Sequence, residues 1–270
     1  MKKHVFSNRA LAALFSNKDI WKLLLPIMVE QLLASLMGMV DTIMVSNVGS
    51  AAISAASLVD SLNILVIQVF SALAAGGTII CSQYLGSHNE KEANRAATQL
   101  LFVVSIISTV IMAVCLIFNE PLLRLIFGSV EDRVMEAAKI YFFYTAISFP
   151  FIALFDGASS IFRAQENTKC PMIISVISNG LNIGGNAVLI WGFDMGIAGA
   201  AIATLLSRIF CAVVVLYFLH RPGNVISLRH LSRPDRKLIG RILSIGLPSG
   251  VENGMFQFGK LAIQSTVSTM

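Results

Sequence analysis

Seven apolar segments follow one another along this chain of 270 residues, and they constrain its fold more than any other feature. Hydrophobic residues make up 56% of the sequence and charged residues only 13%, so the apolar surface is too large to be hidden in one soluble core. A helix needs about 20 mostly apolar residues to cross the hydrocarbon of a bilayer. The segments approach this length at residues 20–46, 52–80, 98–118, 138–160, 171–191, 197–219 and 238–270. The sequence therefore predicts an all-α, polytopic membrane protein, with a six-helix transmembrane bundle and an incomplete seventh helix.

The basic residues indicate how these helices cross the membrane. The chain holds 20 Lys and Arg and has a net charge of +5, but nearly all of them lie in the N-terminal tail and in the connections on one side. The opposite side has only Arg124, Arg133 and Lys139. Positive residues concentrate on the cytoplasmic side of membrane proteins. We therefore expect a plasma-membrane protein with a cytoplasmic N-terminus and membrane lipids as its surroundings, and no nucleic-acid partner.

Short connections between the segments leave little room for a soluble domain, and the longest cytoplasmic one is rich in Arg and Pro. After it, Pro248 and Glu252 repeat Pro26 and Glu30 at one constant offset, 248 − 26 = 222. Weak internal repeats of this kind are typical of secondary transporters. The expected regions are a cytoplasmic lead-in at 1–19, an N-terminal six-helix lobe at 20–220, a cytoplasmic inter-lobe linker at 221–237, and the start of a C-terminal lobe with a truncated seventh helix at 238–270.

One aspartate, Asp41, lies deep inside the first apolar segment. A carboxylate near a bilayer centre costs about 3 kcal/mol on insertion scales, so it normally faces a bundle interior or water and marks an ion or substrate path. Glu30 lies on the same helical face, about 16 Å away along the axis, where it can serve as a gate or as a structural partner. The alternative for Asp41 is an acid that is permanently satisfied by neighbouring amides or by Arg208.

The fifth segment carries a polar stripe on an otherwise apolar helix. Ser175, Asn179, Asn182 and Asn186 follow spacings of four, three and four residues, which place them on one face. Amide oxygens can bind a hard cation such as Na⁺ or hydrogen-bond a carboxyl that titrates. The alternative is ordinary hydrogen bonding between helices, which contributes about 0.6 to 2 kcal/mol per contact.

Three further polar residues interrupt apolar segments. Thr204 and Arg208 lie one turn apart in the sixth segment, and Asp60 lies in the second. We rank Asp60 below Asp41, because Ser57 and Ser61 can satisfy it locally.

Enzymatic and metal-binding signatures are missing from the sequence. It contains no His-Glu-x-x-His, Gly-x-Ser-x-Gly or Gly-x-x-x-x-Gly-Lys motif, and its four cysteines are single and separate. We therefore expect no enzymatic activity, no catalytic residues, no cofactor and no bound metal, apart from possible Na⁺ at Asp41.

Four stretches together resemble the multidrug and toxic compound extrusion (MATE) family. They are Leu25-Pro26 to Asp41-Thr42, Gln83-Tyr84-Leu85-Gly86, Phe162-Arg163-Ala164-Gln165 to Thr168-Lys169-Cys170-Pro171-Met172, and Gly196-x-x-Gly199-Ala200-Ala201-x-Ala203-Thr204. The resemblance implies an antiporter of two six-helix lobes that exports organic cations and other drugs in exchange for Na⁺ or H⁺.

Carried over by position, the cation site of such transporters comprises Asp41, Asn182, Asn186 and Thr204. Many relatives have an aspartate at the position of Asn186, so in this chain a single acid would carry the coupling. Glu30, Asp60, Asn179 and Arg208 are secondary candidates.

The predicted function is cation-coupled export of small organic cations or drugs by alternating access. The chain ends inside its seventh segment, so we expect it to be a fragment that needs the missing C-terminal lobe of the full-length protein. One alternative is a flippase of the same superfamily that moves lipid-linked oligosaccharides, for which several cationic residues would be expected in the cavity. The other is a non-transporting truncated remnant.

Overall fold

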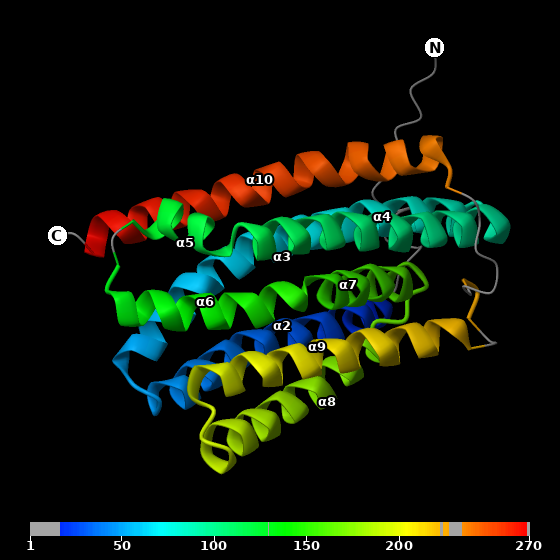
Figure 1. Ribbon diagram of the computed structural model, residues 1–270. Coiled ribbons are helices and arrows are strands. Elements are labelled where there is room, and N and C mark those ends of the chain that lie inside the picture. Colours follow the sequence, from blue (N-terminus) through cyan, green and yellow to red (C-terminus); the bar gives the residue numbers. More distant parts are fainter. Residues whose placement is uncertain (1–16, 129, 222–223, 227–233, 269–270) are drawn as a thin grey trace.

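The computed structural model describes residues 17–128, 130–221, 224–226 and 234–268, which form a bundle of long helices (Figure 1). These residues contain no β-strand, which confirms the predicted all-α class. The predicted lead-in lies mostly outside the described part. The elements are α2 (Asn17–Ser46), α3 (Ser50–Gly86), α4 (Glu90–Ile117), α5 (Asn119–Phe127), α6 (Asp132–Ile147), α7 (Phe149–Ala164), α8 (Lys169–Asn186), the π-helix η1 (Ala187–Gly192), α9 (Gly196–His220) and α10 (Arg236–Ser268).

Five of the described helical stretches are long and apolar enough to cross a membrane, or six if the bent pair α6 and α7 forms one span. The five are α2, α3, α4, α8 together with η1, and α9. They match the predicted complete spans. The seventh segment forms the helix α10. Within the described residues, α10 is not among the helices that are long and apolar enough to cross a membrane.

The predicted segment 138–160 is divided into two helices, which are bent by 42° where α6 meets α7. Pro150 lies in the first turn of α7 and cannot donate a backbone hydrogen bond to the preceding helix. The hydroxyl of Ser148, between the helices, donates to the carbonyl oxygen of Thr145 at 2.5 Å. A proline and a capping serine together thus explain why a continuous apolar pattern gives a broken helix.

Residues 119–136 lie between two predicted apolar segments and were expected to form a loop, but most of this stretch is helical. It forms α5 and the first turn of α6. Glu120 accepts hydrogen bonds from Lys139 at 2.5 Å and from Arg124 at 2.9 Å. The hydrogen bonds from Lys139 and then Arg124 lower the pKa of the exposed Glu120. Pairing of opposite charges therefore stabilises a helix of nine residues that is too short to appear as a membrane-length segment.

Helix α3 is the centre of the bundle and packs against α4, α6, α7 and α10, whereas α8 packs against α9 and α2. Small residues such as Ala55, Ala97 and Ala158 are fully buried and let the helix axes approach closely. The rings of Phe70 and Phe149 meet edge to face at 6.2 Å. By contrast, α2 keeps many large apolar side chains exposed, as expected of a helix that faces lipid or further protein.

Two glycines allow α10 to lie directly on α3. A Cβ atom on Gly76 would come within 2.8 Å of the carbonyl oxygen of Ile242 and 3.0 Å of the Gly246 nitrogen. In the opposite direction, a Cβ atom on Gly246 would come within 3.0 Å of the Ala72 carbonyl oxygen. Backbone faces backbone here, so no flexible side chain can yield.

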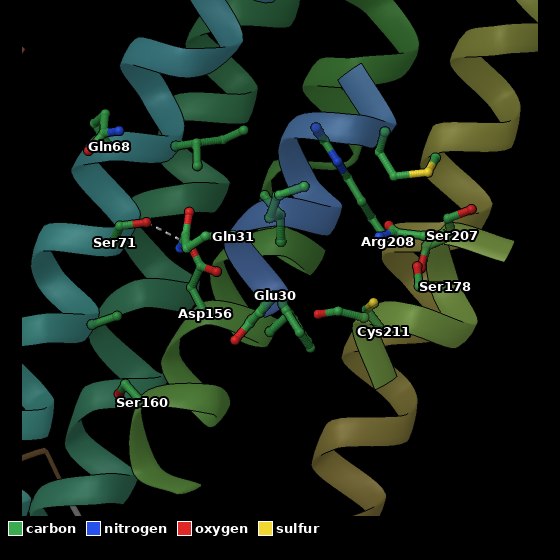
Figure 2. A pocket seen from close by; sticks show the side chains of 18 of the residues that line it. Glu30, Gln31, Gln68, Ser71, Asp156, Ser160, Ser178, Ser207, Arg208 and Cys211 are labelled. Carbon is green, nitrogen blue, oxygen red and sulfur yellow. Dashed lines mark hydrogen bonds between the residues drawn. The ribbon is translucent and has the colours of Figure 1, made fainter. Parts of the chain in front are cut away.

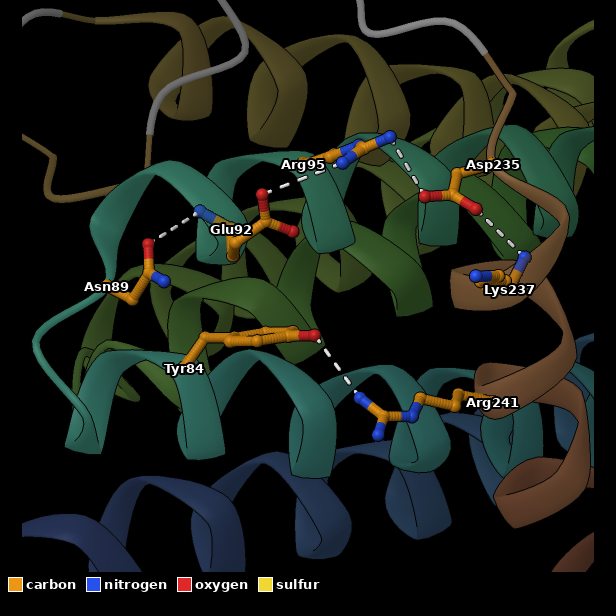
Figure 3. A network of polar contacts seen from close by, with 7 residues as sticks. All are labelled: Tyr84, Asn89, Glu92, Arg95, Asp235, Lys237 and Arg241. Atoms are coloured by element: carbon orange, nitrogen blue, oxygen red, sulfur yellow. Dashed lines mark hydrogen bonds and ion pairs between the residues drawn. The ribbon is translucent and has the colours of Figure 1, made fainter.

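A polar network fastens the beginning of α10 to the end of α3 and the beginning of α4 (Figure 3). Arg95 pairs with Asp235 at 2.9 Å and with Glu92 at 3.6 Å. The guanidinium of Arg241 donates to the hydroxyl of Tyr84 at 3.4 Å. Side-chain contacts at the beginning of α10 thus add to the glycine contact in holding this helix against α3 and α4.

We predict that Gly76→Ala destabilises the protein by about 1 to 3 kcal/mol, because the added methyl group overpacks a contact between two backbones. The melting temperature of the purified natural protein in detergent measures the effect. Gly240→Ala on α10 is the matched control, because an added Cβ meets nothing within 4 Å there. Equal melting temperatures for wild type and Gly76→Ala would show that α3 and α10 do not touch in this way.

Candidate functional site

A cavity of about 840 Å³ opens between α2, α3, α7, α8 and α9. Its walls are partly apolar, with Ile67, Ile152 and Phe155 among the lining side chains, and partly polar (Figure 2). Five charged side chains line it: Glu30, Asp41, Asp156, Arg163 and Arg208. Charges within a membrane bundle are costly, so their concentration around one cavity marks it as the candidate functional site.

A hydrogen-bonded chain of four side chains connects α2, α8 and α9 beside this cavity. Asn186 donates to Asp41 at 2.6 Å and to the side-chain oxygen of Asn182 at 3.2 Å. Asn182 donates in turn to the hydroxyl of Thr204 at 3.3 Å. The four residues selected from the sequence thus lie together in the structure. Their role as a cation site stays a prediction.

Asn186 is the central member of this chain and has no exposed surface. Its amide nitrogen makes both hydrogen bonds, while its side-chain oxygen is buried without a partner in the described part. The helix widens into the π-helix η1 directly after Asn186, and such irregular turns occur often at functional sites. A buried acceptor beside a carboxylate suits a cation, which would satisfy both oxygens.

The wider polar stripe of α8 faces the cavity only in part. Ser175, Asn179 and Asn182 line the cavity, whereas Asn186 is fully buried at its edge. Within the described part of the chain, no group of three or more His, Cys, Asp or Glu side chains lies close enough to hold a metal. The donor set around Asp41 is thus one carboxylate with neutral oxygens, which suits Na⁺ or a proton better than a transition metal.

Glu30 has a structural partner. The guanidinium of Arg163, at the end of α7, donates to both carboxylate oxygens of Glu30 at 3.0 and 3.2 Å. Both hydrogen bonds come from one nitrogen, Nη2, so the contact is bifurcated, while the buried Nε of Arg163 has no partner in the described part. Arg163 lies beyond the predicted segment 138–160, in a stretch expected to be a cytoplasmic connection, but it lines the cavity and joins α7 to α2.

Arg208 is not an ion-pair partner of Asp41. Its guanidinium donates to the Ser148 hydroxyl at 2.6 Å, and the ion pairs within 4.0 Å in the described part do not include it. The alternative in which Arg208 permanently neutralises Asp41 by direct contact is therefore wrong. The amide of Asn186 is the direct partner of Asp41.

Asp60 lies outside the lining of the cavity, and its partners differ from those expected. It accepts hydrogen bonds from Asn63 at 3.3 Å and from Tyr141 at 3.4 Å. The hydroxyl of Ser61 instead donates to the backbone of Ser57. The expectation that these serines satisfy Asp60 is wrong, because serines in a helix bond readily to the carbonyl four residues earlier.

Sequence reasoning missed Asp156 on α7, whose carboxylate accepts a hydrogen bond from Ser71 at 3.1 Å. The signal that identified Asp41 was also present here, since Asp156 is a single acid inside an apolar segment. Gln31 and Gln68 also line this part of the cavity but were not among the candidates.

Comparison with known proteins places this architecture among transporters. The chain is 29% identical to the "Uncharacterized transporter YisQ" of Bacillus subtilis, over 100% of this chain and 60% of that protein. It is 30% identical to the "Probable multidrug resistance protein NorM" of Thermotoga maritima, over 90% of this chain and 53% of that protein. A crystal structure of MATE in the straight conformation superimposes with a TM-score of 0.85 at 25% identity, and the match covers 93% of this chain and 56% of that one.

The chain thus spans little more than half the length of the relatives that it matches. A model of the MatE family matches residues 26–188, which run from within α2 to the start of η1 and include most of the cavity lining. The resemblance seen in the sequence is thereby confirmed, and we conclude that this chain belongs to the MatE family of membrane transporters.

Proposed function

We propose that this protein is a cation-coupled antiporter that exports organic cations or drugs by alternating access, with Asp41 as the residue that binds the coupling ion. The proposal rests on one observation, the hydrogen-bonded chain from Asp41 through Asn186 and Asn182 to Thr204. Family members are transporters rather than enzymes, and relatives such as the protein from Thermotoga maritima are named for multidrug resistance. The substrate class and the coupling are our inference for this chain.

The electrostatic basis of the coupling is the charge on Asp41. An ionised carboxylate at this depth is costly, and a bound Na⁺ or proton neutralises it. Oxygens of Asn186, Asn182 and Thr204 are the neutral groups that would hold the ion beside the carboxylate. Since only one acid is present in this chain of hydrogen bonds, binding changes the charge of the site by one unit. Moving one charge across the membrane yields about 2.3 kcal/mol per 100 mV, which can drive export of a compound.

Helix α2 can transmit this change, because it carries both Asp41 and Glu30. Asp41 connects α2 to α8 through Asn186, while Glu30 connects α2 to α7 through Arg163. Within the described part, α2 packs chiefly against α8, and much of its remaining surface is exposed. We infer that ion binding at Asp41 biases the position of α2 against α8.

The orientation of the protein follows from its basic residues. The chain is a multi-pass membrane protein, and the excess of Lys and Arg in one set of connections supports a cytoplasmic N-terminus in the plasma membrane. With this orientation Asp41 lies towards the outer leaflet. The coupling ion would therefore reach Asp41 from outside.

The charges of the cavity do not favour an anionic, lipid-linked substrate. The guanidiniums of Arg163 and Arg208 line the cavity, but Glu30 neutralises Arg163. Three carboxylates line the cavity as well. The formal charge of the lining is therefore 2 − 3 = −1 with all groups ionised. An organic cation suits this balance better than the diphosphate of a lipid-linked sugar.

We predict that Asp41→Asn abolishes coupled efflux, because the isosteric amide cannot exchange a charge with the ion. Efflux of ethidium from cells that produce the natural protein at full length provides the measurement. Asp194→Asn is the matched control, since Asp194 is exposed in the connection before α9 and far from the cavity lining. Undiminished efflux in Asp41→Asn, at equal protein levels, would remove Asp41 from the mechanism.

We also predict that Thr204→Val weakens the apparent affinity for the coupling ion by about three- to tenfold, the range expected for the loss of one hydrogen bond. The ion dependence of efflux in membrane vesicles measures this affinity. Thr109→Val is the control, because Thr109 is exposed on α4 and its hydroxyl donates only to its own helix at Ser105. Equal ion dependence for the two variants would contradict a role of Thr204 in the site.

A further inference from the structure

All five charged side chains that line the cavity have a polar partner, but only Glu30 and Arg163 form an ion pair. Glu30 and Arg163 neutralise one another, Asp41 accepts a hydrogen bond from Asn186, and Arg208 donates to Ser148. Asp156 resembles Asp41 in this respect, because no cationic side chain of the described residues lies within 4.0 Å of its carboxylate and its hydrogen-bond partner, Ser71, is neutral. The cavity thus holds a second carboxylate, besides Asp41, whose charge no neighbouring side chain cancels by contact.

Asp156 also has unused hydrogen-bonding capacity. Among the described residues, the one hydrogen bond to its carboxylate goes from the Ser71 hydroxyl to Oδ2, although a carboxylate can accept about four. Figure 2 shows Asp156 beside Ser71 of α3 and Gln31 of α2, with Arg208 on the other side of the cavity. Gln31 and Gln68 line the cavity with Asp156 and offer further neutral donors and acceptors.

This group is separate from the chain of hydrogen bonds at Asp41. Asp156 and Ser71 belong to α7 and α3, whereas the partners of Asp41 belong to α8 and α9. No hydrogen bond or ion pair of the described residues joins the two groups. A single cavity therefore offers two carboxylates in different surroundings, one among buried amides and the other beside apolar side chains such as Phe155 and Ile152.

We propose that Asp156, with Ser71, Gln31 and Gln68, forms a second cation-binding subsite, which takes the positively charged nitrogen of the exported organic cation while Asp41 takes the coupling ion. The cavity volume of about 840 Å³ lies within the range of sites for drug-sized ligands. Phe155 and Ile152 provide apolar surface that the body of such a ligand can cover. An inorganic ion would leave this surface uncovered. This inference rests on the proposed export function.

The test compares Asp156→Asn with Asp41→Asn in the purified natural protein at full length. Two quantities are measured for each variant: the dissociation constant of ethidium, a permanent organic cation, and the change in tryptophan fluorescence on adding Na⁺ or lowering the pH without drug. We expect Asp156→Asn to weaken ethidium binding about tenfold or more and to keep the ion response. Asp156→Glu, which retains the charge, should bind ethidium more tightly than Asp156→Asn. Asp132→Asn, an exposed change on α6, should match wild type in both.

The outcomes separate this inference from the export mechanism. Unchanged ethidium affinity in Asp156→Asn, or a wild-type protein that does not bind ethidium, would overturn the subsite. Loss of the ion response in Asp156→Asn would also overturn it, because Asp156 would then belong to the coupling site. An ion response that persists in Asp41→Asn would instead overturn the role of Asp41, while the ethidium measurement would still decide the role of Asp156.

Discussion

The hydrogen bond from Asn186 to Asp41 is the interaction on which this account depends. It places a carboxylate beside a fully buried amide and joins α2, which keeps much of its apolar surface exposed, to the well-packed pair α8 and α9. A charge inside a membrane bundle requires such a partner, and here the partner is neutral. No cationic side chain of the described residues thus cancels the charge of an ionised Asp41 by contact, as the proposed exchange with a mobile cation requires.

The remaining polar contacts divide the cavity into parts with different electrostatic properties. Glu30 and Arg163 form a closed ion pair that connects α2 to α7, whereas Asp156 stays without a cationic partner on the wall formed by α3 and α7. Around these groups, α3 provides the packed centre and α10 lies against it through glycines.

Much of this architecture could be predicted from the sequence, because hydropathy and helical periodicity depend on local composition. The spans and the polar face of α8 follow from these patterns, whereas the meeting of Asp41 with Asn186 was expected only from the resemblance to the MATE family. The bend at Ser148 and the short helix α5 were missed, since one depends on Pro150 and the other on charge pairing with Lys139. The pairing of Glu30 with Arg163 joins residues 133 positions apart, which no local pattern specifies.

The central claim is that Asp41 binds the coupling ion, and a count of bound cations tests it most directly. Binding of radioactive Na⁺ at constant pH, and proton uptake in Na⁺-free solution, can be measured on the purified natural protein and on its Asp41→Asn variant. The account predicts that wild type takes up one more cation per chain than the variant in one of the two measurements. Identical counts in both would contradict it.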